Sequence, residues 1–72
     1  MANFMYKDRL IIAFATLDET TELWIPNVDI SWETGSQQHS HKITDSAMRF
    51  KNCQDAETFI MEIAKAWVDE LR

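Results

Sequence analysis

The residues of this chain best suited to chemistry are two histidines separated by one serine, His39 and His41, with Asp45 a few residues further on. In an extended segment, residues two apart point to the same side, so both imidazoles could bind one metal ion and Asp45 could supply a third ligand. The sequence has no CxxC pair and no further histidine to complete the set. A histidine pair in a segment of Gln and Ser residues is usually a solvated loop. Metal binding is therefore the weaker alternative, and we predict no cofactor.

The single cysteine, Cys53, could instead act as a nucleophile paired with a histidine, because the N-terminus of a helix lowers a thiol pKa. Two neighbouring carboxylates, Asp55 and Glu57, oppose thiolate formation, and no glycine-rich oxyanion loop is present. The helical periodicity places Cys53 at the inward edge of the predicted helix, where a thiol behaves as a small buried hydrophobe. No nucleotide-binding or hydrolase motif occurs either. We therefore predict no catalytic residue and no enzymatic activity.

Three carboxylates recur every seven residues along the outward face of the C-terminal helix: Asp55, Glu62 and Asp69, with Lys65 between the last two. The ordinary interpretation of such a column is a solvated helix face that carries local ion pairs. The alternative is an acidic decoy or inhibitor that occupies the basic surface of a nucleic-acid-binding protein.

Three tryptophans, Trp24, Trp32 and Trp67, could form a stacking platform for bases or sugars. Such platforms need interleaved lysine and arginine, whereas the charged neighbours of Trp24 and Trp32 are acidic. Packing in the core or at a protein interface is the better interpretation of these rings.

Composition restricts the partners further. Seventy-two residues make one domain, and one cysteine allows no intrachain disulfide. Seven basic and twelve acidic side chains leave a net charge of −5, which opposes generic binding to nucleic acid or anionic lipid. The longest apolar run, Leu10 to Ala15, is far too short to span a bilayer, and the first nine residues do not resemble a secretory leader. We predict a cytoplasmic protein that binds no nucleic acid, membrane or small molecule.

Apolar periodicity predicts an α+β domain: a three-stranded antiparallel sheet packed by one C-terminal helix in two layers. The predicted strands cover residues 6–17, 23–33 and 42–50, and the helix covers residues 53–71 with Asn52 as its N-cap. Residues 1–5 are expected to be a loose N-terminus, and residues 34–41 (TGSQQHSH) a mobile loop. Pro26 interrupts the second strand, which predicts a bulge at that position.

Both faces of the first predicted strand are apolar: Leu10, Ile12 and Phe14 point one way, and Ile11 and Ala13 the other. A single helix can cover only one of these faces. Residues beside the main helical stripe also widen the apolar arc of the helix. We therefore expect a homodimer, or a contact with another protein, to cover the excess. The side chains expected to anchor this contact are Trp24, Trp32, Met61, Trp67 and Val68.

The C-terminal third resembles the ending of several small bacterial proteins of uncharacterised function, in which antiparallel strands precede a phenylalanine, a helix cap, an Ala-Glu pair and a long helix. The matching residues are Arg49-Phe50, Asn52, Asp55-Ala56-Glu57 and Ala64 to Asp69. The histidine segment and the tryptophan-proline strand depart from that pattern. The resemblance implies the fold and no catalytic residue.

Overall fold

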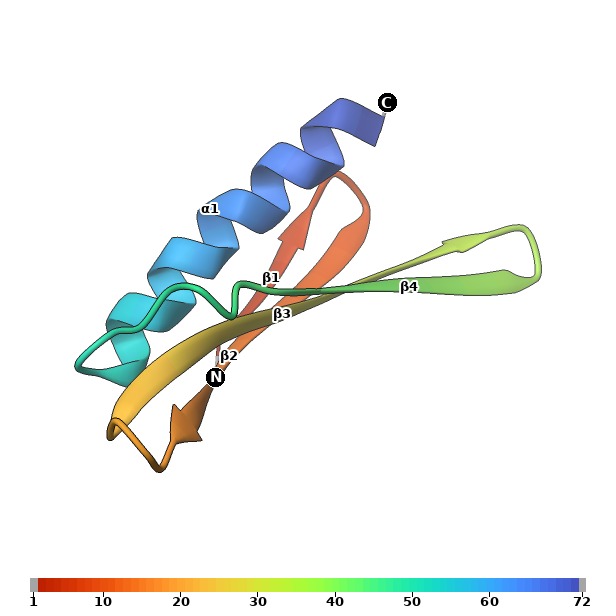
Figure 1. The fold of residues 1–72 in the computed structure, drawn as a ribbon. Helices are drawn as coiled ribbons and strands as arrows, with labels where there is room; N and C mark the ends of the chain where they lie inside the picture. The colour runs from red at the N-terminus through yellow and green to blue at the C-terminus, as the bar shows by residue number, and fades with distance from the viewer. Residues whose placement is uncertain (1, 72) are drawn as a thin grey trace.

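A computed structural model describes residues 2–71, and the side chains of residues 2–70 (Figure 1). These residues form an antiparallel sheet of four strands in the order β1-β2-β3-β4, followed by one helix. The α+β class and the C-terminal helix are confirmed, whereas the predicted count of three strands is wrong. The elements are β1 (Ala2–Tyr6), β2 (Arg9–Asp18), β3 (Leu23–Thr34), β4 (Gln37–Thr44) and α1 (Cys53–Leu71).

The additional strand comes from the region expected to be a loose N-terminus. Residues 2–6 pair with β2 in continuous register, from Ala2 opposite Ala13 to Tyr6 opposite Arg9. Met1 lies outside the described residues. The predicted strand over residues 6–17 is thus split by a turn at Lys7 and Asp8, whose φ angles are 50° and 64°. Glycine or asparagine usually marks such a two-residue turn, and neither occurs here.

The segment expected to be a mobile loop is also part of the sheet. Gly35, with φ of 62°, forms the turn of a second hairpin, and β4 pairs with β3 from Gln37 opposite Thr34 to Thr44 opposite Asn27. The predicted third strand over residues 42–50 therefore overlaps β4 only at its end. Phe50 adds an isolated bridge to Trp24 through two backbone hydrogen bonds of 2.7 and 3.0 Å.

Pro26 lies in the inner strand β3 without the predicted bulge, because β2 and β3 pair residue by residue through this position. On the side of β3 that pairs with β4, the residue opposite Pro26 is Asp45, which lies just past the end of β4. The Asp45 N–H donates to the Pro26 carbonyl at 3.3 Å. The missing N–H of proline therefore faces a place where the ladder has already ended. A proline is tolerated there for the same reason as on an edge strand.

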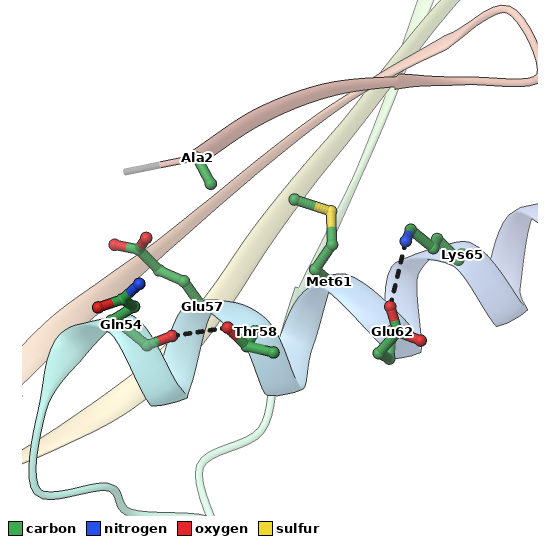
Figure 2. A pocket seen from close by; sticks show the side chains of 7 residues that line it. All are labelled: Ala2, Gln54, Glu57, Thr58, Met61, Glu62 and Lys65. Atoms are coloured by element: carbon green, nitrogen blue, oxygen red, sulfur yellow. Dashed lines mark hydrogen bonds and ion pairs between the residues drawn. The ribbon is translucent and has the colours of Figure 1, made fainter.

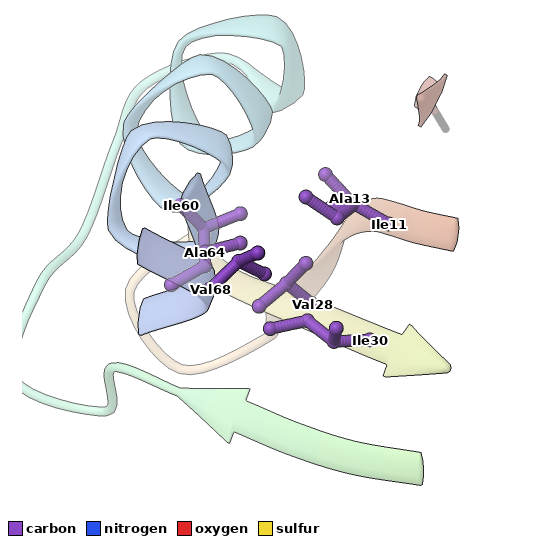
Figure 3. Packing of buried hydrophobic residues seen from close by; sticks show 7 residues of the cluster. All are labelled: Ile11, Ala13, Val28, Ile30, Ile60, Ala64 and Val68. Carbon is purple, nitrogen blue, oxygen red and sulfur yellow. The ribbon is translucent and has the colours of Figure 1, made fainter. Parts of the chain in front are cut away.

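The core lies between α1 and one face of the sheet (Figure 3). Its buried side chains are Ile11, Ala13, Val28, Ile30, Ile60, Ala64 and Val68. Asn52 caps the helix as predicted: its Oδ1 accepts from the Asp55 N–H at 2.8 Å, and its Nδ2 donates to the Asp55 carboxylate at 3.1 Å. Such a cap contributes about 1 kcal/mol.

The molecule is elongated, with principal extents of 43 × 19 × 18 Å. Its radius of gyration is 12.9 Å, against about 11.2 Å for a compact domain of this length. The β3–β4 hairpin extends away from the rest of the sheet (Figure 1), because β3 residues beyond Ser31 pair with β4 alone. No helix among the described residues is long and apolar enough to cross a membrane.

Candidate interaction surface

The sheet face that points away from α1 is apolar along β2. Burial alternates in this strand: Ile11 and Ala13 are buried under the helix, whereas Leu10, Ile12 and Phe14 on the other face are only half-buried. We call this exposed apolar surface the open patch. Its members are Met5 of β1, Leu10, Ile12 and Phe14 of β2, and Ile25 of β3. Met5 is the most exposed of them, at 63%.

One row of residues crosses the open patch from edge to edge. Asn3 and Asp29 lie on either side of Ile12, and Lys42 of β4 follows Asp29. The Oδ1 atom of Asp29 is buried and accepts no hydrogen bond from the described residues. An unsatisfied buried acceptor costs about 1–3 kcal/mol, and a charged one costs more.

A satisfied polar cluster lies within the Asp18 end of the patch, beside Phe14 and Ile25. Asn27 donates to the Thr16 hydroxyl at 2.9 Å and to the Ile25 carbonyl at 3.0 Å, and it accepts from the Thr44 hydroxyl at 2.7 Å. The hydrogen-bonding needs of Asn27 are met within the chain. Asp29, two residues further along β3, differs because its Oδ1 atom accepts no hydrogen bond from the described residues.

A shallow hollow of about 310 Å³ lies at the other end of the patch, between the β1–β2 turn and the projecting hairpin. It is lined by Met5, Asp8, Leu10, Ser31, Trp32, Glu33 and Gln38. Met5, Leu10 and Trp32 contribute apolar side chains to this hollow, and Asp8 and Glu33 contribute carboxylates.

The two histidines are engaged by tryptophans on the helix side of the sheet. The His41 ring stacks on Trp67 with centroids 4.3 Å apart and an interplanar angle of 5°, and His39 stacks on Trp32 at 5.5 Å. Trp32 and Trp67 contact each other at 5.7 Å, and the Arg9 guanidinium lies 5.1 Å from the Trp32 ring. Two predicted interface anchors therefore pack within the monomer while remaining half-buried.

The three candidate metal ligands have separate partners. His39 Nε2 lies 2.7 Å from the Thr34 hydroxyl, and the Asp45 carboxylate accepts from the Ala47 N–H at 3.2 Å. Among the residues that the structure describes, no group of three His, Cys, Asp or Glu side chains could hold a metal ion. The weak metal candidates His39, His41 and Asp45 thus do not form a site together.

Cys53 is exposed, which corrects the expectation of a buried thiol. It is the first residue of α1 and precedes the helical residues that pack against the sheet. The first buried helical residue is Ala56.

The remaining predicted anchors have different environments. Val68 is only 3% exposed in the monomer core, so its side chain is not available to a partner. Trp24 and Met61 are half-buried. Met61 points toward β1 and lines a groove of about 330 Å³ between the start of β1 and the helix (Figure 2). The groove is lined by Ala2, Gln54, Glu57, Thr58, Met61, Glu62 and Lys65.

The carboxylates of the acidic column of α1 form hydrogen bonds and ion pairs with neighbouring side chains. Asp69 accepts from the Tyr6 hydroxyl at 2.9 Å and from Lys7 Nζ at 2.6 Å, and Glu62 pairs with Lys65 at 3.2 Å. The hydrogen bond to Asp69 raises the pKa of Tyr6 and also that of Lys7. These contacts join β1 to the helix, and they leave the acidic-decoy interpretation without specific support.

A further ion pair joins Arg49 to Asp18 at the opposite end of the molecule. Arg49 Nε lies 3.1 Å from Asp18, which also accepts from the Thr20 N–H at 3.0 Å. The Thr20 backbone and then the Arg49 guanidinium hold the pKa of the Asp18 carboxyl below its usual value. The contact with Arg49 joins the segment between β4 and α1 to the end of β2, and the contact with Thr20 lies within the β2–β3 turn.

No family model, curated protein or solved structure matches this chain. The resemblance of the C-terminal third to small bacterial proteins therefore stays a prediction.

Proposed function

We propose that this chain is a small protein-interaction module that forms a homodimer through the open patch. The observation that carries the proposal is the apolar face of β2 opposite the helix, which no described element covers. Burying apolar surface stabilises association by about 25 cal/mol per Å², so leaving this face in water is unfavourable.

Surface area supports the same proposal. The accessible surface is 5012 Å², against about 4,650 Å² for a compact monomer of this mass. The excess agrees with the large radius of gyration. A two-fold contact between identical faces is the commonest way in which small proteins cover such surface.

The open patch also differs from the rest of the surface in charge. The chain has a net charge of −5, yet the row through Ile12 contains one carboxylate, Asp29, and one ammonium, Lys42. Two copies can therefore bring these rows together without stacking net charge on net charge. Elsewhere the acidic surface disfavours non-specific association.

The proposal is tested by measuring mass in solution. Sedimentation equilibrium or light scattering under reducing conditions should give twice 8.5 kDa, with the reductant present because Cys53 is exposed. Substituting Ile12→Lys places an ammonium in the centre of the patch and should give a folded monomer. A wild-type chain that stays monomeric at millimolar concentration would refute the proposal.

Ser40→Lys is the matched control, because Ser40 is exposed on β4 and lies outside the apolar patch. It adds the same charge and should leave the dimer intact. The affinity should also change little with ionic strength, whereas an acidic decoy bound to a basic protein would dissociate steeply as salt rises.

A further inference from the structure

We infer that a second copy of this chain pairs with the outer edge of β1, so that β1 runs antiparallel to β1 of the other copy with the two Phe4 residues opposite each other. This contact goes beyond the proposed contact between open patches, because it uses the edge of the sheet and not its face. Pairing of the two edges joins the two sheets into one continuous sheet. Both helices then lie on the same side of it.

The outer edge of β1 lacks the features that protect a strand from pairing with another chain. β1 is the outermost strand of the sheet, and it pairs with β2 without a bulge. Its sequence, ANFMY, contains no proline and no charged residue. Charges, prolines and bulges are common ways in which proteins prevent pairing at a sheet edge. The other outer strand, β4, has such a protection in Lys42.

β1 also exposes apolar side chains on both faces of the sheet. Phe4 is 40% exposed and Met5 is 63% exposed. Phe4 lies opposite the buried Ile11 and therefore on the helix face, whereas Met5 lies opposite Leu10 on the open face. A partner that stacks on one face can cover only one of these side chains. A strand added at the edge contacts both.

The backbone groups that point away from the sheet belong to Asn3 and Met5. A two-residue turn is flanked by a hydrogen-bonded pair, here Tyr6 and Arg9, and hydrogen-bonded pairs then alternate along the ladder. Phe4 therefore bonds to β2, and the N–H and C=O groups of its two neighbours face outward. The backbone hydrogen bond that β3 makes just past the end of β4 gives the same phase when the alternation is followed across the sheet.

This phase selects one symmetric register. Centring the pair on Phe4 matches the whole of β1 with itself and places Asn3 opposite Met5 of the other copy, twice. Each of these pairs exchanges two backbone hydrogen bonds. Centring on Met5 would instead require Lys7, whose φ of 50° takes it out of the strand. Centring on Asn3 would move the pair past the described start of β1.

The space beside β1 on the helix face is open to the second Phe4 ring. α1 packs mainly on β2 and β3, and a groove of about 330 Å³ separates it from the start of β1 (Figure 2). Ala2 and Met61 contribute apolar side chains to this groove, and Lys65 Nζ lies 4.8 Å from the centre of the Phe4 ring. Two Phe4 rings at the edge would form an aromatic pair beside this groove.

The edge contact is smaller than the patch contact, because only one short strand of each copy takes part. It should therefore form at higher protein concentration than the patch dimer. Light scattering of the wild-type chain at millimolar concentration should give a mass above twice 8.5 kDa.

Disulfide trapping tests the register directly, in a Cys53→Ser background that also carries Ile12→Lys to remove the patch contact. In the inferred pair the two Phe4 Cα atoms lie ~4.5 Å apart, which a disulfide can span. Met5→Cys is the matched control, since Met5 is more exposed but lies opposite Asn3 and not opposite itself. Under copper-phenanthroline oxidation, Phe4→Cys should form covalent dimer at least about tenfold faster than Met5→Cys.

A backbone substitution provides a second test. Asn3→Pro removes an N–H that points outward and takes no hydrogen bond from the β1–β2 ladder. Added to Phe4→Cys, it should slow the trapping at least about tenfold, whereas Asn3→Ala, which keeps the N–H, should leave the rate unchanged. Circular dichroism establishes that each variant is folded. Should Asn3→Pro unfold, the comparison of Phe4→Cys with Met5→Cys decides alone.

The outcomes separate the edge contact from the patch contact. Equal trapping of Phe4→Cys and Met5→Cys would overturn the edge contact, and a wild-type dimer that Ile12→Lys dissociates would still support the patch. Faster trapping of Ser40→Cys, on β4, would overturn the inference in favour of pairing at the other edge. Rapid trapping of Phe4→Cys would support the edge contact even if the wild-type chain formed no patch dimer.

Discussion

The histidines of β4 show how tertiary packing determines what a side chain does. Each imidazole lies against a tryptophan ring, and aromatic pairs of this kind contribute about 0.5–1.5 kcal/mol beyond the area that they bury. His39 and His41 point to the same side of β4, as expected for residues two apart. Trp32 and Trp67 occupy that side, so the rings that could have bound a metal ion stack on these tryptophans instead.

Tyr6 provides a test at the scale of a single residue, because it is the only tyrosine in the chain. Its hydroxyl donates to Asp69, which raises its pKa above 10.0. In Asp69→Asn the pKa should fall toward that ordinary value. The titration is measured by tyrosinate absorbance near 295 nm.

The sign of the pH dependence follows from the same contact. A raised pKa means that the folded state holds the proton more tightly than the unfolded state. The hydrogen bond therefore contributes to stability below pH 10 and loses this contribution as the pH rises through the folded-state pKa. Asp55→Asn, on the same helix but distant from Tyr6, should leave the titration unchanged. An unshifted Tyr6 in Asp69→Asn would contradict the contact.

At the scale of elements, the β1–β2 hairpin is the feature that the local sequence did not predict. Its turn is made by Lys7 and Asp8, both in the left-handed region that glycine adopts most readily. Pairing with β2 stabilises β1 and outweighs the local cost of this turn. The contact of Tyr6 and Lys7 with Asp69 of α1 also favours the hairpin.

Replacing Asp8 by glycine should therefore stabilise the protein. A non-glycine residue with a left-handed backbone costs about 1 kcal/mol, so Asp8→Gly should raise the free energy of unfolding by up to about that amount. Urea denaturation followed by tryptophan fluorescence measures the change. Glu19→Gly, in the next turn at a position without positive φ, should lower stability, and a loss of stability in Asp8→Gly would contradict the assigned turn.

At the scale of the whole molecule, one helix and four strands make an incomplete sandwich. The helix covers one face, and the excess surface and elongated shape follow from the uncovered face and the projecting hairpin. A two-stranded ribbon is only marginally stable in water by itself. Here the stacked rings of Trp32 and His39 support it.

A homodimer links folding to concentration. Ligand binding to the folded state alone raises apparent stability by mass action, and the second copy acts as that ligand. The midpoint of thermal unfolding should therefore rise as the protein concentration is increased tenfold and hundredfold. The Ile12→Lys variant should show a midpoint independent of concentration, and a wild-type midpoint that does not move would contradict the dimer.

The local sequence was sufficient to predict α1, its Asn52 cap, the α+β class and the two apolar faces of β2. Helical and strand periodicities are properties of neighbouring residues. The extra strand, the hairpin over residues 34–41 and the place of Pro26 depended on pairing between distant segments, which neighbouring residues do not encode. The same holds for the burial of Val68 and for the engagement of His39 and His41 by tryptophans. Tertiary structure decided these features because the free energy of burying and pairing distant residues exceeds the weak local preferences at these positions.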